Sequence, residues 1–311
     1  MDYTVQSLGA GSPASKSVRR RRIIEALWGY LFLGPQLVGL LAFSLVPLIS
    51  VFVIAMVNWD GLGPIEFVGF QNYIDEFQAG SDMFIALKNT FYYTVLAVPL
   101  GLVLALLVAL ALNKVHGKTI YRILYFMPFV TTSIAVAVMW MWLLNGDFGL
   151  VNVFLKDWFH IQGPNWLTDS NFVIPAIAIV GIWSGLGYNM IILLAGLQNI
   201  PATYAEAARV DGANRWQLFW RVTFPLLSPT IFLVTVLSVI ASFQVFDQVF
   251  VLTGGGPGKD SYVMVYHIYK QGFERFQFGP ASASAVILFV IIVIATLIQF
   301  WLQNRWVHYE A

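Results

Sequence analysis

The chain has 311 residues, of which 59% are hydrophobic and only 11% are charged, and its net charge of +1 gives no indication of a nucleic-acid partner. A soluble domain carries about 25% charged residues, so this composition, gathered into long apolar blocks, indicates a membrane protein. The absence of cysteine excludes disulfides, thiolate chemistry and cysteine-based metal sites. The four histidines are scattered and form no cluster with the spacing of metal ligands.

Six apolar blocks are candidates for membrane spans, because each meets or exceeds the roughly 20 residues needed to cross the hydrocarbon core. The sequence therefore predicts an all-α membrane protein with a six-span domain over residues 27–304, between tails at 1–26 and 305–311. We expect Pro35 and Pro47 to bend the first span, since each lacks a backbone donor. The predicted spans lie near residues 27–57, 89–112, 120–144, 172–199, 226–252 and 281–303.

Basic residues are distributed unevenly between the predicted loops, and this bias sets the orientation of membrane helices. With the N-terminus in the cytoplasm, twelve Lys and Arg residues fall on the cytoplasmic side and five on the outer side. Arg19 to Arg22 also resemble the start of a secretion signal, but the apolar run that follows is too long and ends in no small-residue cleavage site. The sequence therefore predicts a retained first span and two cytoplasmic termini.

Polar residues within the predicted spans are candidates for a binding site. They are costly in lipid, so they face either a cavity or a partner helix. Packing of small and hydroxyl residues between helices explains each of them equally well. The candidates found in this way on the fourth and fifth spans are Ser184, Asn189, Ser242, Gln244 and Asp247.

The loop between the fourth and fifth spans is charged and helix-forming. Thr203 and Glu206 have the spacing of a capping box, and Gly212 can end that helix in a left-handed conformation. Asn214 and Gln217 repeat the spacing and predict the start of a second helix. An amphipathic helix lying on the membrane surface would show the same spacing.

The same loop resembles the EAA loop of the permease subunits of binding-protein-dependent ABC importers. That pattern reads Glu-Ala-Ala, then Asp-Gly-Ala, then a proline before the next span, here Pro225 with Pro229 after it. In the family this helix sits in a cleft of the ATPase subunit and transmits its opening and closing. The resemblance implies a type I ABC importer permease fold with a coupling loop over residues 200–224. The residues to which coupling is assigned are Glu206, Ala207, Ala208, Arg209, Asp211, Gly212 and Ala213.

A second signature follows the fifth span. Residues 252–257 read L-T-G-G-G-P, and Tyr266, Tyr269 and Phe273 complete a Y-x-x-Y and G-F pattern. A Gly-Pro run alone indicates only a tight turn. The combination resembles the carbohydrate-uptake branch of these permeases, which includes MalF-like subunits and relatives for oligosaccharides and glycerol phosphate.

In the maltose-type relatives the stretches P-Y-x-x-x-S and G-x-x-Y line the sugar site. The resemblance therefore implies substrate contacts for Phe129, Ser133, Gly185 and Tyr188. Phe129 replaces the tyrosine of the pattern, so the hydroxyl at this position is lost. Sugars need hydroxyl and amide partners together with aromatic faces, and these spans supply that mixture.

The resemblance implies a transport subunit and not an enzyme, with no catalytic residue, cofactor or metal site in this chain. ATP and Mg would be bound by two cytoplasmic ATPase subunits, because the sequence has no complete nucleotide-binding loop. A second permease of similar fold, making a heterodimer, and an extracytoplasmic substrate-binding protein would complete the assembly in a prokaryotic plasma membrane. Two alternatives stay open: an importer of another polar solute such as glycerol phosphate, and an ion-coupled carrier, for which Asp247 would be the ionisable residue within an apolar run.

Overall fold

The computed structural model describes residues 14–78, 80–115 and 117–307, and it divides the chain into two compact units, Met1–Val53 and Ile54–Ala311. The first unit consists of α1 (Ala14–Leu40), a π-helical turn η1 (Leu41–Leu45) and α2 (Val46–Ile54). Residues 14–26 of the predicted N-terminal tail belong to α1, residues 1–13 lie outside the described residues, and the boundary of the tail stays a prediction.

Two π-helical turns lie just before prolines. Pro47 has no N–H to donate to the carbonyl four residues earlier, and η1 ahead of it closes with Val46 N–H on Leu41 O. The turn η2 (Phe219–Thr223) precedes Pro225 in the same way, with Phe224 N–H bonded to the carbonyl of Phe219. The chain therefore accommodates each proline by widening one turn, and the helix continues through it.

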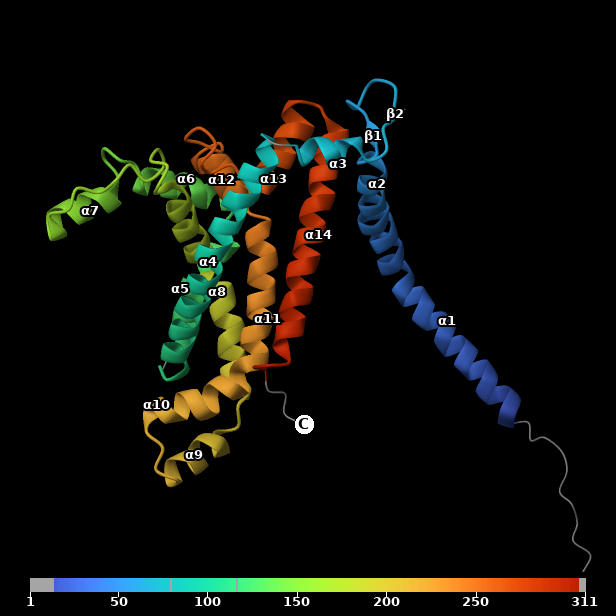
Figure 1. Ribbon diagram of the computed structural model, residues 1–311. Coiled ribbons are helices and arrows are strands. Elements are labelled where there is room, and N and C mark those ends of the chain that lie inside the picture. The colour runs from blue at the N-terminus through green and yellow to red at the C-terminus, as the bar shows by residue number, and fades with distance from the viewer. Residues whose placement is uncertain (1–13, 79, 116, 308–311) are drawn as a thin grey trace, which may run out of the picture. The chain divides into compact units, whose positions relative to one another are not determined.

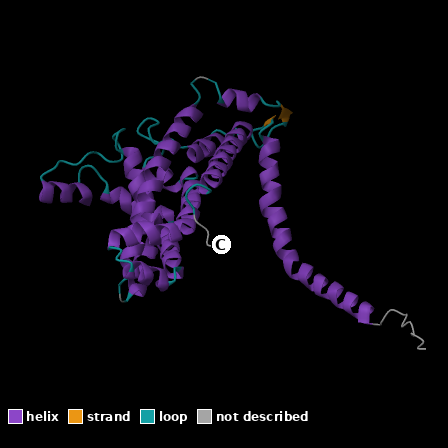
Figure 2. Cartoon of the chain, turned by 60° about the horizontal axis from the view of Figure 1, so that its bottom comes forward, coloured by secondary structure: helices purple, strands orange, loops and turns teal. Residues whose placement is uncertain are grey.

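The second unit begins with an antiparallel hairpin in which Val57 lies opposite Phe67, formed by β1 (Val57–Asn58) and β2 (Glu66–Phe67). The rest of this unit is helical within the described residues (Figure 2). Its helices are α3 (Gln71–Glu76), α4 (Asp82–Asn113), α5 (Lys118–Val130), α6 (Ser133–Leu143), α7 (Leu150–Phe159), α8 (Val173–Asn199), α9 (Ala202–Val210), α10 (Arg215–Leu218), α11 (Phe224–Phe243), α12 (Asp247–Leu252), α13 (Met264–Tyr269), the π-helical turn η3 (Lys270–Glu274) and α14 (Phe278–Gln303).

The long helices α4, α5, α8, α11 and α14 of the second unit run along one another, with α9 and α10 at one end and α12 and α13 at the other (Figure 1). Buried alanines on α4, Ala105 and Ala109, share an apolar cluster with the fully buried Leu193 of α8 and Leu227 of α11. Small residues let membrane helices approach closely, and this packing brings the faces of α4, α8 and α11 together.

Five helices of the described chain are long and apolar enough to span a membrane: Ile23–Ile54, Asp82–Asn113, Val173–Asn199, Arg215–Phe243 and Phe278–Gln303. The pair α5 and α6 is a further candidate, but it is bent by 96°. The predicted span over 120–144 is therefore divided between two helices that meet at a sharp bend. The span predicted over 226–252 has other bounds in the structure, because the spanning helix covers Arg215–Phe243 and α12 starts only at Asp247.

Candidate functional site

A cavity of about 570 Å³ lies among α4, α5, α6, α8, α11 and α12, at the two points where the predicted spans are broken. Thr131 lines it from the break between α5 and α6, and Gln244 lines it from the break between α11 and α12. Irregular backbone is tolerated at membrane depth where it lines a cavity, and broken helices are typical of transport sites. The cavity therefore lies where the two helix breaks are, as expected for a transport site.

The structure brings every predicted substrate contact to the wall of this one cavity, although they come from five different helices and one loop. The binding role of each stays a prediction. The predicted contacts that line the cavity are Phe129, Ser133, Ser184, Gly185, Tyr188, Asn189, Ser242, Gln244 and Asp247.

An aromatic pair forms part of the wall. The rings of Phe129 and Tyr188 are stacked, with centroids 4.7 Å apart and planes 17° apart. Phe129 is 47% exposed and Tyr188 is half-buried, so the pair is not sealed in the protein interior. Stacked rings at a cavity wall offer an apolar surface on which the C–H face of a sugar can lie.

The hydroxyl groups of the wall differ in how many hydrogen-bond contacts they make within the protein. Ser242 is buried, and its Oγ lies 2.8 Å from Val239 O and 3.0 Å from Thr94 Oγ1, the two acceptors within reach of its one O–H. Ser184 Oγ donates to Val180 O at 2.8 Å, which leaves its lone pairs free to accept. Helix packing therefore accounts for Ser242, whereas Ser184 keeps hydrogen-bonding capacity toward the cavity.

Two glycines on α8 have different roles: one allows close helix packing, and the other lines the cavity. A Cβ on Gly187 would lie 2.0 Å from the carbonyl oxygen of Tyr125, so this glycine lets α8 approach the backbone of α5. A Cβ on Gly185 would meet nothing within 4 Å, so this position opens onto free space. On the following turn Asn189 Nδ2 donates to Ser238 Oγ at 3.3 Å, which joins α8 to α11 at the cavity.

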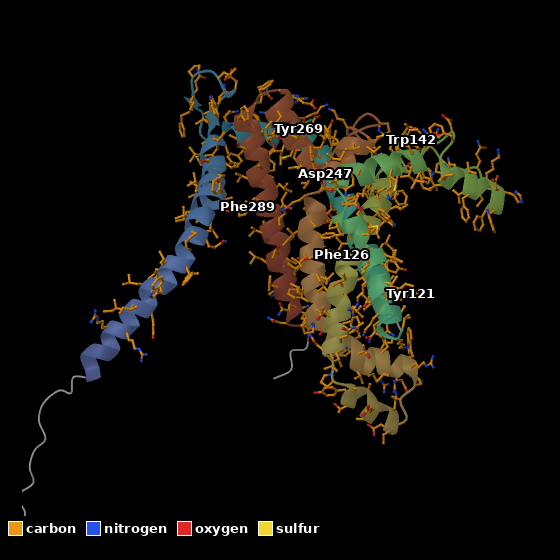
Figure 3. All side chains as sticks on the ribbon, turned by 180° about the vertical axis from the view of Figure 1, so that it is seen from behind. Tyr121, Phe126, Trp142, Asp247, Tyr269 and Phe289 are labelled. Atoms are coloured by element: carbon orange, nitrogen blue, oxygen red, sulfur yellow. The ribbon has the colours of Figure 1, made fainter. Side chains whose placement is uncertain are left out.

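The break after α11 supplies accessible polar groups to the cavity. Gln244 and Asp247 are both exposed and both line the cavity. Figure 3 shows Asp247 between Phe126 and Tyr269 along the length of the bundle. Asp247 is the acidic group among the lining residues that the structure describes, and these include no Lys, Arg or His. The described wall therefore combines apolar side chains with polar groups, and its charge is weakly acidic.

The helix pair at the opposite end carries the predicted coupling residues. Its first capping prediction is wrong: α9 begins at Ala202 with Pro201 as N-cap, and no side chain caps it. Thr203 already lies in the first helical turn, because proline fixes a backbone angle suited to a helix start. The second prediction is confirmed, since Asn214 and Gln217 form a reciprocal capping box with both bonds at 2.9 Å.

Gly212 ends α9 in the left-handed conformation, as expected, with φ of +82°. The N–H of Gly212 bonds to Arg209 O at 3.0 Å, and that of Ala213 bonds to Ala208 O at 2.9 Å. These are the two bonds of a Schellman cap, which satisfies the carbonyls at the helix end and turns the chain. The corner between α9 and α10 is thus fixed by backbone geometry.

The surface of α9 is open. Glu206, Arg209 and Asp211 are exposed, and none takes part in the ion pairs found within 4.0 Å among the described residues. Val210 is 89% exposed and Tyr204 is 44% exposed. An exposed mixture of unpaired charge, small residues and apolar side chains is what a protein partner would cover.

The second helix of this pair is continuous with the fifth span, which the sequence interpretation missed. The helix runs unbroken over Arg215–Phe243 through η2. Near its start the rings of Trp216 and Trp220 are 5.6 Å apart, and Trp220 and Phe224 are 5.1 Å apart. Near its far end, the residues that line the cavity are Leu237, Ser238, Ala241 and Ser242. The aromatic spacing at 216, 220 and 224 was the available signal for this continuity.

Comparison with known proteins supports this arrangement. Residues 97–308 match the family described as binding-protein-dependent transport system inner membrane component. The chain is 35% identical to the probable ABC transporter permease protein YesP of Bacillus subtilis, covering 97% of this chain and 98% of that protein. It is 33% identical to the sn-glycerol-3-phosphate transport system permease protein UgpA of Agrobacterium fabrum, covering 90% and 96%.

A solved structure shows the same fold. The crystal structure of a bacterial ABC transporter involved in the import of the acidic polysaccharide alginate contains a chain that is 25% identical. It covers 94% of this chain and 99% of its own length, with a TM-score of 0.77. The all-α permease architecture inferred from the sequence is therefore confirmed.

Proposed function

Because this chain belongs to the family of binding-protein-dependent transport system inner membrane components, and is a permease subunit of an ABC importer, we propose that it forms part of the pathway for a neutral sugar or oligosaccharide. The observation that carries the proposal is the cavity at the two helix breaks. Its wall combines hydroxyl groups, amides and a stacked aromatic pair. These are the groups that recognise a polyhydroxylated ligand with apolar C–H faces.

The charge of the wall favours a neutral substrate. The runner-up is glycerol phosphate, supported by the similarity to UgpA. A phosphate needs positive groups or helix N-termini around it, whereas the described wall of this cavity holds Asp247 and no basic side chain. The same argument weighs against an acidic polysaccharide such as alginate. The family assignment gives no support to a stand-alone ion-coupled carrier.

We assign the input of energy to residues 206–213 of α9 and its corner. In this proposal an ATPase subunit docks on the exposed face of α9 and moves it when ATP binds. The fixed corner at Gly212 passes the movement to α10, and the continuous helix over Arg215–Phe243 carries it to the cavity wall. The cavity then opens alternately to the two sides of the membrane.

The remaining assembly follows from the same reasoning. A second permease of similar fold would complete the cavity, two ATPases would dock on one coupling helix each, and a binding protein would deliver substrate from outside. The excess of basic residues on one side supports cytoplasmic termini and a cytoplasmic α9 and α10. The ends of the second unit agree with this, since α9 and α10 lie opposite α12 and α13 (Figure 1).

The test is uptake by the reconstituted transporter in proteoliposomes, with its binding protein and ATPases present. A panel of neutral mono- and oligosaccharides is compared with glycerol phosphate, each as a labelled solute. The account predicts ATP-dependent uptake of at least one neutral sugar and none of glycerol phosphate. Uptake of glycerol phosphate alone would overturn the substrate assignment and leave the importer assignment intact.

A further inference from the structure

The short helix α3 and its two flanking phenylalanines have an apolar face that is exposed. At about 100° per residue, positions 70, 74 and 77 lie on one side of a helix. Phe70 is 66% exposed, Ile74 is 54% exposed and Phe77 is 56% exposed. We call these three side chains the outer face of α3. In a water-soluble protein a helix buries such a face, so this exposure calls for an explanation.

The opposite side of α3 is polar and buried. Asn72 is 5% exposed, and its Nδ2 donates to the carbonyls of Ala55 and Val57, both at 2.9 Å. Glu76 is also 5% exposed, and it contacts His267 Nε2 at 3.1 Å and Gln271 Nε2 at 2.5 Å. The helix is therefore inverted, with polar side chains inward and apolar side chains outward.

A third side of α3 is polar and exposed. Gln71 and Asp75 lie there, joined by a hydrogen bond of 2.8 Å from Gln71 Nε2. The helix thus has one side for the protein, one with polar groups suited to water, and one that is apolar and uncovered. A helix at the surface of a membrane meets three such surroundings at once.

The outer face of α3 is continuous with the exposed face of a spanning helix. The ring of Phe77 contacts that of Phe84 on α4, with centroids 6.3 Å apart. Further along α4, Phe91 is 60% exposed and Val95 is 51% exposed. Lys88 is exposed on the turn between Phe84 and Phe91, where a lysine can reach the lipid headgroups. An apolar surface that continues onto a spanning helix indicates lipid as its occupant.

We propose that α3 is an interfacial helix of the outer leaflet, with Phe70, Ile74 and Phe77 in the acyl region just below the headgroups. Gln71 and Asp75 then face the headgroup water. The buried Glu76 joins α3 to His267 and Gln271 of the last outer loop. Through this contact α3 holds that loop, which carries the Y-x-x-Y pattern, at a fixed height above the bilayer.

The test uses spin labels on single cysteines, which the chain allows without prior substitution because it has no cysteine. The complete transporter is placed in lipid nanodiscs, and collisions of each label with oxygen and with a water-soluble nickel complex are compared. Ile74→Cys reports the outer face, and Asp75→Cys on the same helix is its matched control. Phe91→Cys is the lipid reference, and Asp260→Cys, exposed in the last outer loop, is the aqueous reference. Retained uptake activity shows that each variant is assembled.

The proposal predicts that the label at 74 collides with oxygen and is shielded from nickel, as at 91, while the label at 75 shows the reverse, as at 260. Nickel access at 74 equal to that at 75 would overturn it, because the outer face would then lie in water. Shielding of 74 from both reagents would also overturn it, because a protein partner would then cover the face. If Ile74→Cys does not assemble, Phe70→Cys reports the same face.

Discussion

Some polar side chains around the cavity are bonded to neighbouring helices, whereas those of α9 extend into open space. Asn189 and Ser242 are held by hydrogen bonds to neighbouring helices, but Glu206 and Arg209 form none of the ion pairs found among the described residues. Contacts within the chain thus hold these cavity side chains, while α9 has a fixed backbone shape and an exposed surface. Under the proposed function, the difference means that substrate recognition and energy input are built at separate places, which the helix over Arg215–Phe243 would join.

The close approach of α5 and α8 is the firmest part of the cavity side, and Gly187→Ala is expected to break it. The added Cβ would lie 2.0 Å from the carbonyl oxygen of Tyr125, which is backbone and cannot rotate away. Overpacking of this kind costs about 1–3 kcal/mol. Thermal unfolding in detergent should show a clear loss of stability. Gly185→Ala, two residues earlier and open to space, should unfold like the wild type. Equal unfolding of the two variants would contradict the packing.

The corner at Gly212 tests the other region. Its φ of +82° is unfavourable for a β-branched residue, so Gly212→Val should distort the corner. A left-handed backbone costs an ordinary residue about 1–2 kcal/mol, which corresponds to a loss of about tenfold in ATPase docking. Co-purification of the ATPase and the rate of uptake measure it. Gly212→Asn is the matched control, because asparagine tolerates this conformation. If Val and Asn behaved alike, the corner would not transmit movement.

The aromatic pair tests recognition without affecting coupling. Tyr188→Ala removes one of two stacked rings from the wall, and such a contact is worth about 0.5–1.5 kcal/mol. The concentration of sugar-loaded binding protein that half-saturates ATPase activity should rise several-fold, with ATPase docking unchanged. Tyr121→Ala, on α5 but outside the cavity lining, should leave it unchanged. A loss of docking in Tyr188→Ala would mean that the two regions are not separable.

The smallest expected effect is on thermal stability and concerns the contact between α3 and the last outer loop. It adds a third region, the outer end, to the comparison of the cavity with α9. Burial acts to raise the pKa of Glu76, but hydrogen bonds with His267 and Gln271 outweigh it and hold this pKa below its ordinary value of 4.5. A depressed pKa in the folded state stabilises the protein above 4.5, and the stabilisation is lost as the pH falls through the folded pKa. The gap in thermal stability between wild type and Glu76→Gln should therefore narrow below pH 4.5. A gap independent of pH would show that the charge of Glu76 does not contribute to stability.

Sequence patterns predicted the helical class and the corner at Gly212 because these depend on local chemistry. Apolar length reports a span wherever it occurs, and a glycine beside a capping box indicates a turn whatever surrounds it. The breaks at 131–132 and 244–246 were not predicted, because hydropathy averages over them. Thr131 and Gln244 are the residues at which α5 and α11 end, and both line the cavity, so the position of these helix ends goes with the tertiary structure.

The predicted site residues came from both the residues and the family pattern, and the structure separates them further. Ser242 and Ser184 are the same residue type within a span, yet only the contacts of Ser242 show a hydroxyl directed into helix packing. Gly185 and Gly187 are likewise indistinguishable by composition and differ completely in what surrounds them. Such distinctions depend on the neighbouring helix, and a sequence without knowledge of its tertiary contacts cannot provide them.

The central claim is that movement of α9 changes the side to which the cavity opens. Gly185→Cys provides the reporter, because its side chain would point into open space within the cavity and the chain has no other cysteine. A membrane-impermeant maleimide is applied to either side of reconstituted transporter, without nucleotide and with ATP and vanadate. The account predicts labelling from the cytoplasmic side without nucleotide, labelling from the outer side with ATP and vanadate, and loss of the switch in Gly212→Val. Labelling from one side under all conditions would contradict it.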